Sequence, residues 1–378
     1  MTLRENFRKR DADYRSAVMC FGEEEEETYA LCRWLRARKF NVEETLVLID
    51  DCISERKEAV KHDFYIDPSA AIGAPFSSYI ELYPQLYHGH AKNGCPLFIS
   101  KPGLINIHAV DCITTLNGLI KLHWHVMHHD FRKRLIEQKA SMGSSFTKFA
   151  CFCILDLDGL STTSITRKVM EIIKCQSRID NVCYVETLSK MLIINAPVSF
   201  SMTWKVIKSF VDARTQNKIE IYSNQKKATA RILELCEAKY VPSDYGGTAK
   251  NSHDILLDQT GASEIIRQEM KLVHLRSYET FPVKVNAGER LEVVVYTKAT
   301  GGSTVTVLNK KKSTIAQETV IHTSAHSAGT DDFEQQYPTQ VELTSNAVGP
   351  DHINIRFDSL TSRLHSDYYL LSLRFFKN

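Results

Sequence analysis

The stretch "MLIINAPVSFSMTWKVIKSFVDARTQNKI", residues 191–219, decides the fold that we expect. It overlaps an apolar run, "KMLIINAP" over 190–197, whose closing proline marks the end of a buried strand. Residues 199–211 show helical periodicity, and "KIEIYS" over 218–223 predicts a further strand. Because parallel strands need a crossover between them, this order predicts a mostly parallel sheet covered by helices.

The same alternation of strands and helices extends toward the N-terminus. We expect a strand at "CPLFIS" (95–100), a long helix over 112–139, a strand and turn at "FACFCILDLDG" (149–159), and a helix over 164–180. Together with the first stretch, these segments predict an α/β domain.

The flanking regions have different patterns. Residues 24–62 predict helices, whereas the prolines and glycines of 66–90 predict a loop. From residue 281 onward, short alternating runs such as "HINIRFD" (352–358) predict an antiparallel β-sandwich. Residues 246–275 are mixed, and we expect them to link two domains.

Composition excludes several classes of protein. The 378 residues carry 47 Lys and Arg against 45 Asp and Glu, which does not indicate a nucleic-acid-binding protein. No apolar stretch approaches the roughly 18 residues that a membrane-spanning helix needs. The ten cysteines form no regular framework and none follows Cys236, so we expect free thiols in a reducing compartment. We therefore expect a soluble intracellular protein that touches membranes only peripherally.

One short helix, "LCRWLRARKF" (31–40), combines large apolar residues with four cations. Five glutamates, residues 23–27, precede it. Acidic residues in the first turn and basic residues near the end both suit the helix dipole, which gives a purely structural reason for this order.

Enzymatic motifs are absent from the sequence: it has no G-x-S-x-G elbow, P-loop, G-x-G-x-x-G or H-E-x-x-H. Asp156 and Asp158 end a strand, where a solvated turn is a simpler interpretation than a metal site. In "HWHVMHHD" (123–130), His125 and His129 share a helix face, with His128 beside them. No Cys or carboxylate stands at a diagnostic spacing, so we favour a polar helix face and expect no catalytic residue, cofactor or metal.

The helix at 199–211 leaves two interpretations open. Its apolar stripe consists of Phe200, Trp204, Ile207 and Val211. Lys205 and Lys208 lie off that stripe. A membrane-interface helix and a surface helix packed on the sheet both fit this pattern.

Four motifs together resemble the CRAL-TRIO lipid-transfer proteins, in the branch with a C-terminal GOLD domain (supernatant-protein-factor-like or phosphatidylinositol-transfer-like). They are "LCRWLRARKF", "ILDLDGL" (154–160), the 191–219 stretch and "VPSDYGGT" (241–248). In the sandwich, "INIRFDSLTSRLHSDYYLLSL" (353–373) is similar to the GOLD pattern. The resemblance implies a helical N-terminal module (1–65), a lipid-binding domain (66–250), a linker (251–276) and a GOLD β-sandwich (277–378).

The resemblance also implies an apolar cavity closed by the 199–211 helix as a movable gate. Pocket and gate positions are Phe98, Val126, Phe200, Trp204, Ile207 and Val211. Positions that match a phosphoinositide headgroup site are Arg38, Lys39, Glu186, Thr215 and Lys218. Thr187 stands where relatives carry an arginine, and Phe98 and Val126 stand where choline-lipid relatives use tyrosines.

The function expected from this resemblance is cytosolic lipid binding and transfer without covalent chemistry. The ligand would be phosphatidylinositol, another phospholipid, or a tocopherol- or squalene-like lipid, exchanged at intracellular membranes such as Golgi or endosomes. Two alternatives stay open. One is a trafficking adaptor that binds a protein partner through the GOLD domain, and the other is a metal enzyme or hydrolase using His125 or Asp156.

Overall fold

The computed structural model describes residues 2–146, 148–161, 164–259, 265–321, 337–343, 349–361 and 367–377. The chain divides into two compact units, which we describe separately. Unit 1 comprises Met1–Pro68, Pro84–Leu104 and Ile120–Ile255, and unit 2 comprises Ser69–Tyr83, Ile105–Leu119 and Leu256–Asn378. Within the described residues, no helix has the length and apolar character needed to cross a membrane.

Unit 1 begins with four helices, α1 (Leu3–Lys9), α2 (Ala12–Val18), α3 (Glu27–Ala37) and α4 (Val42–Lys61). The side chain of Asn41 caps α4 by accepting from the backbone N–H of Glu44, which confirms the predicted N-terminus. Of the five glutamates, only Glu27 lies in the first turn of α3, so the helix-dipole interpretation covers one of them. Glu25 is fully buried against Arg33 instead.

The sheet of unit 1 has the order β1-β2-β3-β4-β5. Its strands are β1 (Gln85–His90), β2 (Pro96–Ser100), β3 (Cys151–Asp156), β4 (Leu188–Ile194) and β5 (Ile219–Ile221). Only β1 runs antiparallel to its neighbour, while the other adjacent pairs are parallel. This confirms the α/β class with a mixed sheet.

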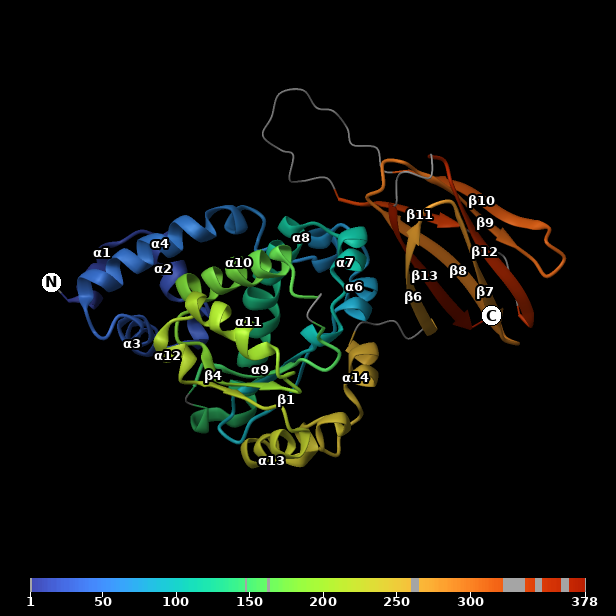
Figure 1. Ribbon diagram of the computed structural model, residues 1–378. Coiled ribbons are helices and arrows are strands. Elements are labelled where there is room, and N and C mark those ends of the chain that lie inside the picture. Colours follow the sequence, from blue (N-terminus) through green and yellow to red (C-terminus); the bar gives the residue numbers. More distant parts are fainter. Residues whose placement is uncertain are drawn as a thin grey trace, which may run out of the picture. The chain divides into compact units, whose positions relative to one another are not determined.

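Helices connect these strands and follow the last of them, β5 (Figure 1). They are α8 (Leu116–His125), a π-helical turn (Val126–Asp130), α9 (Phe131–Met142), α10 (Arg167–Cys183), α11 (Phe200–Ile207), α12 (Ala213–Gln216), α13 (Gln225–Leu235) and α14 (Ser252–Gln259). A short 3-10 turn, Lys208–Phe210, extends α11, so the helix predicted over 199–211 is confirmed with an irregular end. α10 packs against both α4 and α11.

The loop predicted over 66–90 is wrong. This segment holds α5 (Pro68–Ile72), α6 (Phe76–Leu82) and β1. The prolines misled the prediction, because Pro68 is the first residue of α5 and Pro75 is the N-cap of α6, positions where the missing N–H costs nothing. The helix predicted over 112–139 starts later, at α8, because Thr114 adopts an extended conformation after α7 (Ile107–Ile113).

Unit 2 contains two four-stranded antiparallel sheets, which confirms the predicted β-sandwich. One has the order β10 (Thr314–Val320), β9 (Ser303–Leu308), β12 (Asp351–Ser359), β7 (Tyr278–Val285). The other has the order β11 (Thr339–Leu343), β8 (Glu289–Thr297), β13 (Asp367–Lys377), β6 (Ile265–Leu275). β6 lies within the segment expected to be a linker. Residues 362–366 of the GOLD-like motif lie outside the described residues.

Helices α5 to α7 belong to unit 2, although they come from the α/β part of the sequence. α7 packs on β8 and β13. The buried guanidinium of Arg374 donates to the hydroxyl of Ser78 at 2.8 Å and to that of Tyr296 at 2.9 Å. A polar network therefore joins α6 to the sandwich.

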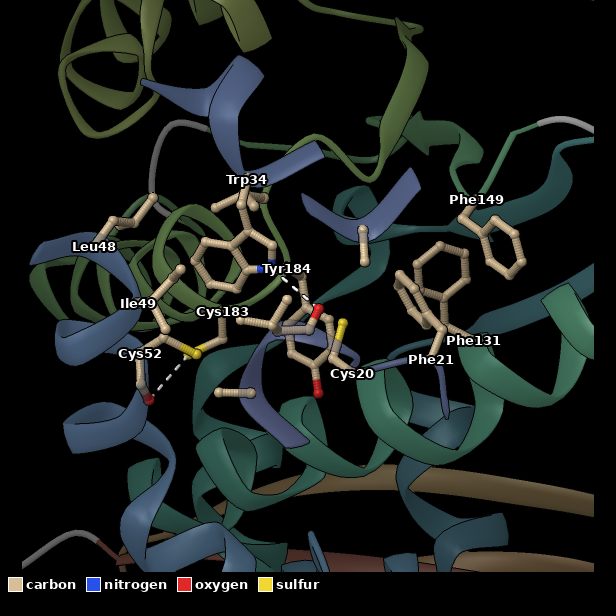
Figure 2. Packing of buried hydrophobic residues seen from close by; sticks show 14 of the residues in the cluster. Cys20, Phe21, Trp34, Leu48, Ile49, Cys52, Phe131, Phe149, Cys183 and Tyr184 are labelled. Atoms are coloured by element: carbon tan, nitrogen blue, oxygen red, sulfur yellow. Dashed lines mark hydrogen bonds between the residues drawn. The ribbon is translucent and has the colours of Figure 1, made fainter. Parts of the chain in front are cut away.

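The main core of unit 1 lies between its N-terminal helices and the helices α9 and α10. Figure 2 shows Phe21, Phe131 and Phe149 packed together at one side of this core. Trp34 is fully buried at the other side and donates its indole N–H to the carbonyl of Val18 at 3.1 Å. All ten cysteines are free thiols, as expected.

Candidate functional site

One face of the sheet in unit 1 points toward α11. Strand register places side chains of β2, β3, β4 and β5 on this face, because directly paired residues of neighbouring parallel strands point the same way. We call seven apolar ones the gate-facing surface: Phe98, Cys151, Cys153, Leu155, Met191, Ile193 and Ile219. Ser100 and Ile221 lie on the same face, so the face is mostly apolar.

The two faces of this sheet differ in how well they are covered. On the opposite face the apolar side chains of the central strands are at most 2% exposed: Leu97, Ile99, Phe152, Ile154, Leu192 and Ile194. Two polar residues of that face, Lys190 and Asp156, are more exposed. On the gate-facing surface, Phe98, Cys151, Leu155, Met191 and Ile219 are only partly buried. The interior of a folded protein is normally close-packed, so the incomplete burial of central strands indicates that α11 does not fill the surface beneath it.

α11 carries apolar side chains on both of its sides. Phe200 is buried, and Trp204 and Ile207 pack with it against Leu155, Leu157 and Ile193. On the outside, Met202 and Val206 are 69% and 50% exposed. Lys205 and Lys208 are also exposed. The sheet-packing stripe predicted for Phe200, Trp204 and Ile207 is therefore present, together with an exposed apolar side.

The other predicted pocket positions lie elsewhere. Phe98 contacts the ring of Tyr87, with centroids 4.8 Å apart, and packs against the main core. Val126 packs against the same core and begins the π-helical turn. Val211 is partly buried beyond the end of α11. Register still places Phe98 on the gate-facing surface, because it pairs with Cys153.

Glu186 pairs with one cation of the predicted headgroup site, Lys218, and with Arg214, which the sequence did not predict there. Its carboxylate, 12% exposed, pairs with Arg214 Nε at 3.1 Å and with Lys218 Nζ at 3.1 Å. Glu186 itself has a φ of 58°, a left-handed conformation that few residues other than glycine adopt. The structure therefore brings together Glu186 and Lys218, two of the positions predicted for the headgroup site.

Arg214 is the residue that sequence reasoning missed at this site. Besides pairing with Glu186, its guanidinium donates to the carbonyl of Arg36 at the end of α3. It thereby joins the turn that carries Arg38 and Lys39 to Glu186. Its only signal in the sequence is its place directly before Thr215, which does not reveal the partner.

The remaining predicted headgroup residues, Arg38, Lys39 and Thr215, either make local hydrogen bonds or are exposed. Arg38 donates to the carbonyl of Ala37 at 3.2 Å, and the Lys39 side chain is exposed. The hydroxyl of Thr215 donates to the carboxylate of Asp212, the N-cap of α12. The structure thus links the end of α3 to the cluster through Arg214 and the carbonyl of Arg36, while the hydroxyl of Thr215 bonds to the N-cap of α12.

Asp158 is exposed in a turn, as expected, but Asp156 is not, so the expectation of a solvated turn is wrong for Asp156. Its buried carboxylate accepts from Asn195 Nδ2 at 2.8 Å, from the hydroxyl of Tyr245 at 3.0 Å and from the backbone N–H of Asp158 at 3.0 Å. These bonds tie the ends of β3 and β4 to the "VPSDYGGT" segment. They give Asp156 a structural role in place of a metal-binding one.

The histidine cluster contacts the turn at residues 63–65. His125 Nδ1 lies 2.8 Å from the carbonyl of Tyr65, and His129 Nε2 lies 2.7 Å from that of Asp63. Among the described residues, no three His, Cys, Asp or Glu side chains are arranged to hold a metal ion.

Residues 80–247 match the family model described as "CRAL/TRIO domain". The matched segment takes in the whole sheet of unit 1, together with α11 and the Glu186 cluster. The family match ends at residue 247, so a GOLD domain in the C-terminal sandwich stays a prediction.

Curated relatives match a longer segment. The chain is 28% identical over 234 residues to "Phosphatidylinositol/phosphatidylcholine transfer protein SFH9" of Arabidopsis thaliana, covering 60% of this chain and 38% of that one. It is 30% identical over 236 residues to "SEC14 cytosolic factor" of Yarrowia lipolytica, covering 61% and 45%. The chain thus spans less than half the length of these two relatives. The crystal structure of Sfh5 is similar with a TM-score of 0.42 at 14% identity, over 68% of this chain and 86% of that one.

Proposed function

We propose that this chain, whose residues 80–247 match the CRAL/TRIO family model, binds a hydrophobic lipid between the gate-facing surface and α11 and transfers it between membranes. The observation that carries the proposal is the difference between the two faces of one sheet. Apolar side chains on central strands stay partly exposed beneath α11, whereas their neighbours on the other face are buried. An acyl chain or a similar hydrocarbon would cover them.

The energetics of a lipid require an enclosed site. Each methylene removed from water contributes about 0.8 kcal/mol. On the order of 30 methylenes in a two-chain lipid therefore represent ~25 kcal/mol that must be kept from water. An open groove leaves much of that hydrocarbon exposed, whereas a sheet with a helical cover encloses it.

α11 serves in this proposal as the movable cover. Its inner residues Phe200, Trp204 and Ile207 hold it on the sheet. Its exposed Met202 and Val206, with Lys205 and Lys208 beside them, suit the boundary between lipid headgroups and acyl chains. Contact with a membrane would draw the outer side into the bilayer and loosen the inner packing, which opens the path for lipid exchange.

The headgroup of the lipid would lie at the Glu186 cluster. Arg214 and Lys218 already meet there, and charged donors of this kind bind phosphate strongly. Arg214 supplies a cation beside Glu186 in the absence of an arginine at Thr187, whose hydroxyl donates instead to the carbonyl of Tyr184 at 2.6 Å. We therefore favour a phosphatidylinositol-like headgroup. The relatives' names, which include phosphatidylinositol and phosphatidylcholine transfer, support this choice.

In this proposal the chain makes and breaks no covalent bond. It binds lipid in the cytosol and visits membranes only peripherally, through the outer side of α11. The cycle consists of docking, opening of α11, exchange of lipid and closure.

Native mass spectrometry of the full chain, purified from a eukaryotic expression host, tests the proposal directly. We expect a mass increment equal to one lipid, and headgroup analysis of the extracted lipid identifies it. A fluorescence assay of lipid transfer between donor and acceptor vesicles then tests exchange. A chain that carries no lipid and does not accelerate transfer of phosphatidylinositol, phosphatidylcholine or tocopherol would contradict the proposal.

A further inference from the structure

A cavity lies in unit 1, lined by residues outside the gate-facing surface and the Glu186 cluster. Its volume is about 310 Å³, and its lining consists of Asp63, His128, His129, Arg132, Lys133, Ile136 and Glu137. A water molecule takes about 30 Å³ of liquid volume, so the space is large enough for a small organic molecule. Four of the seven lining residues are basic in type, which raises the question of what they bind.

The backbone on both sides of this cavity is unusual. Asp63, Phe64 and Tyr65 all have positive φ, of 46°, 50° and 60°. Three consecutive residues other than glycine in this conformation store strain, which is typical of functional sites. Opposite them, the helix that carries the histidines widens into a π-helical turn, Val126–Asp130, another feature that is frequent at functional sites.

The histidines hold this strained turn in place. His125 and His129 contact its carbonyls, as described above, and the ring of His128 stacks on Phe64 with centroids 3.6 Å apart. Burial, reinforced by the nearby charges of His129, Arg132 and Arg56, lowers the pKa of His128 to about 3. His128 is therefore neutral at physiological pH.

Two nitrogen atoms at this cavity are buried without a partner among the described residues. They are Nδ1 of His128 and Nε of Arg132. A buried polar atom without a hydrogen bond costs about 1–3 kcal/mol, and more when the group is charged. The Arg132 guanidinium also lies against the backbone of Gly22, where an added Cβ would stand 2.4 Å from Nη2. The guanidinium of Arg132 therefore packs against Gly22 with its Nε–H unpaired among the described residues.

The charges of the lining residues indicate which kind of ligand the cavity would bind. Glu137 is paired with Arg134 at 3.1 Å, which balances its charge. The backbone carbonyl of Asp63 bonds to the ring of His129. The carboxylate of Asp63 is therefore the lining acid left beside the two cations Arg132 and Lys133 once Glu137 is paired with Arg134. An arginine fork with an adjacent lysine and a neutral imidazole matches an anion with several oxygens.

We propose that this cavity binds the phosphate of a phosphomonoester, held by Arg132 and Lys133 beside His128. The phosphomonoester comes either from a small soluble metabolite or from a phosphorylated lipid headgroup, since the two present the same chemistry. The site is separate from the proposed lipid-binding surface and does not depend on it.

Calorimetry on the full chain distinguishes the two sources. Glycerol 3-phosphate is the soluble probe, with glycerol at equal ionic strength as the uncharged comparison. Phosphatidylcholine vesicles with and without phosphatidylinositol 4-phosphate are the lipid probe. We expect saturable binding of one phosphorylated probe and a loss of about ten-fold in affinity, or about 1.4 kcal/mol, for Arg132→Gln.

Arg178→Gln is the matched control, because Arg178 is an arginine of α10 that pairs with Glu55 and does not line the cavity. Lys133→Gln changes an exposed side chain and provides a second test if Arg132→Gln does not fold. Imidazole NMR signals of His128 and His129 should also shift on titration with the bound probe. Absence of binding to either probe at millimolar concentration, or equal affinities of Arg132→Gln and Arg178→Gln, would overturn the proposal.

Discussion

The guanidinium of Arg33 donates to the carbonyl of Val185, 152 positions later in the chain, at 3.0 Å. Val185 directly precedes Glu186, whose carboxylate pairs with Arg214 and Lys218 at the candidate headgroup site. Arg33 is fully buried and also pairs with Glu25, with Nε 2.7 Å from Oε1. The N-terminal helices therefore fix the strained turn that presents Glu186, which couples the stability of this region to the site.

Removing Arg33 should destabilise unit 1 strongly. Arg33→Met leaves the buried carboxylate of Glu25 unpaired, and breaking a buried pair in this way costs about 3–5 kcal/mol. Chemical denaturation followed by circular dichroism measures the loss. Lys57→Met, at an exposed position of α4, is the control and should change stability by less than about 0.5 kcal/mol.

The double variant Glu25→Gln/Arg33→Met separates the ion pair from the hydrogen bonds to Val18 and Val185. It should recover part of the lost stability, since no buried charge then remains unpaired. Stability as low as that of Arg33→Met alone would show that the backbone contacts dominate.

The two sides of α11 should have separable roles in lipid transfer. Trp204→Asp places a charge against the apolar surface beneath α11, so we expect loss of bound lipid and of vesicle-to-vesicle transfer with the fold retained. Met202→Asp changes the exposed side, so we expect weaker vesicle association with bound lipid retained. Transfer at the wild-type rate by Trp204→Asp would contradict the role of α11 as a gate.

The cations near Glu186 should select for a phosphate-bearing headgroup. Lys39→Ala with Lys218→Ala, and separately Arg214→Gln, should weaken phosphatidylinositol binding by about ten-fold or more, because each removes a charged donor. Binding of tocopherol, which has no phosphate, should change little. An equal loss for both ligands would show that these residues act on the fold, and Lys57→Ala provides the control for a general effect of lost charge.

Lowering the pH should reveal how much Glu289 contributes to the stability of unit 2. Two nitrogen atoms of Arg267 lie 3.0 Å and 3.1 Å from its carboxylate, and this pairing is the main reason that its pKa falls from 4.5 to about 2. The folded state thus has the lower pKa, so its stabilisation is complete above pH 4.5 and is lost as pH falls toward about 2.

We expect Glu289→Gln to be less stable than the wild type at neutral pH. The difference in stability between the two proteins should shrink as the pH falls from 4.5 to about 2. Thermal unfolding across that pH range measures it. A difference that stays constant with pH would contradict the assignment.

The sequence by itself determined the elements whose signal is local. The apolar run of β4, the helical periodicity of α11 and the alternation in β12 are all set by residues a few positions apart, and the structure confirms each of them. Local signals failed where one residue type suits two structures. Pro68 and Pro75 suggested a loop and instead begin helices.

Only the tertiary structure decided which charged residues are buried and which partners they have. Arg33 and Lys39 come from the same short basic segment, yet one is fully buried and the other exposed. Arg214 carries no local sign that it pairs with Glu186. The physical reason is that a buried charge is stable only with its partner, and a partner far away in sequence becomes a neighbour only when distant elements pack together.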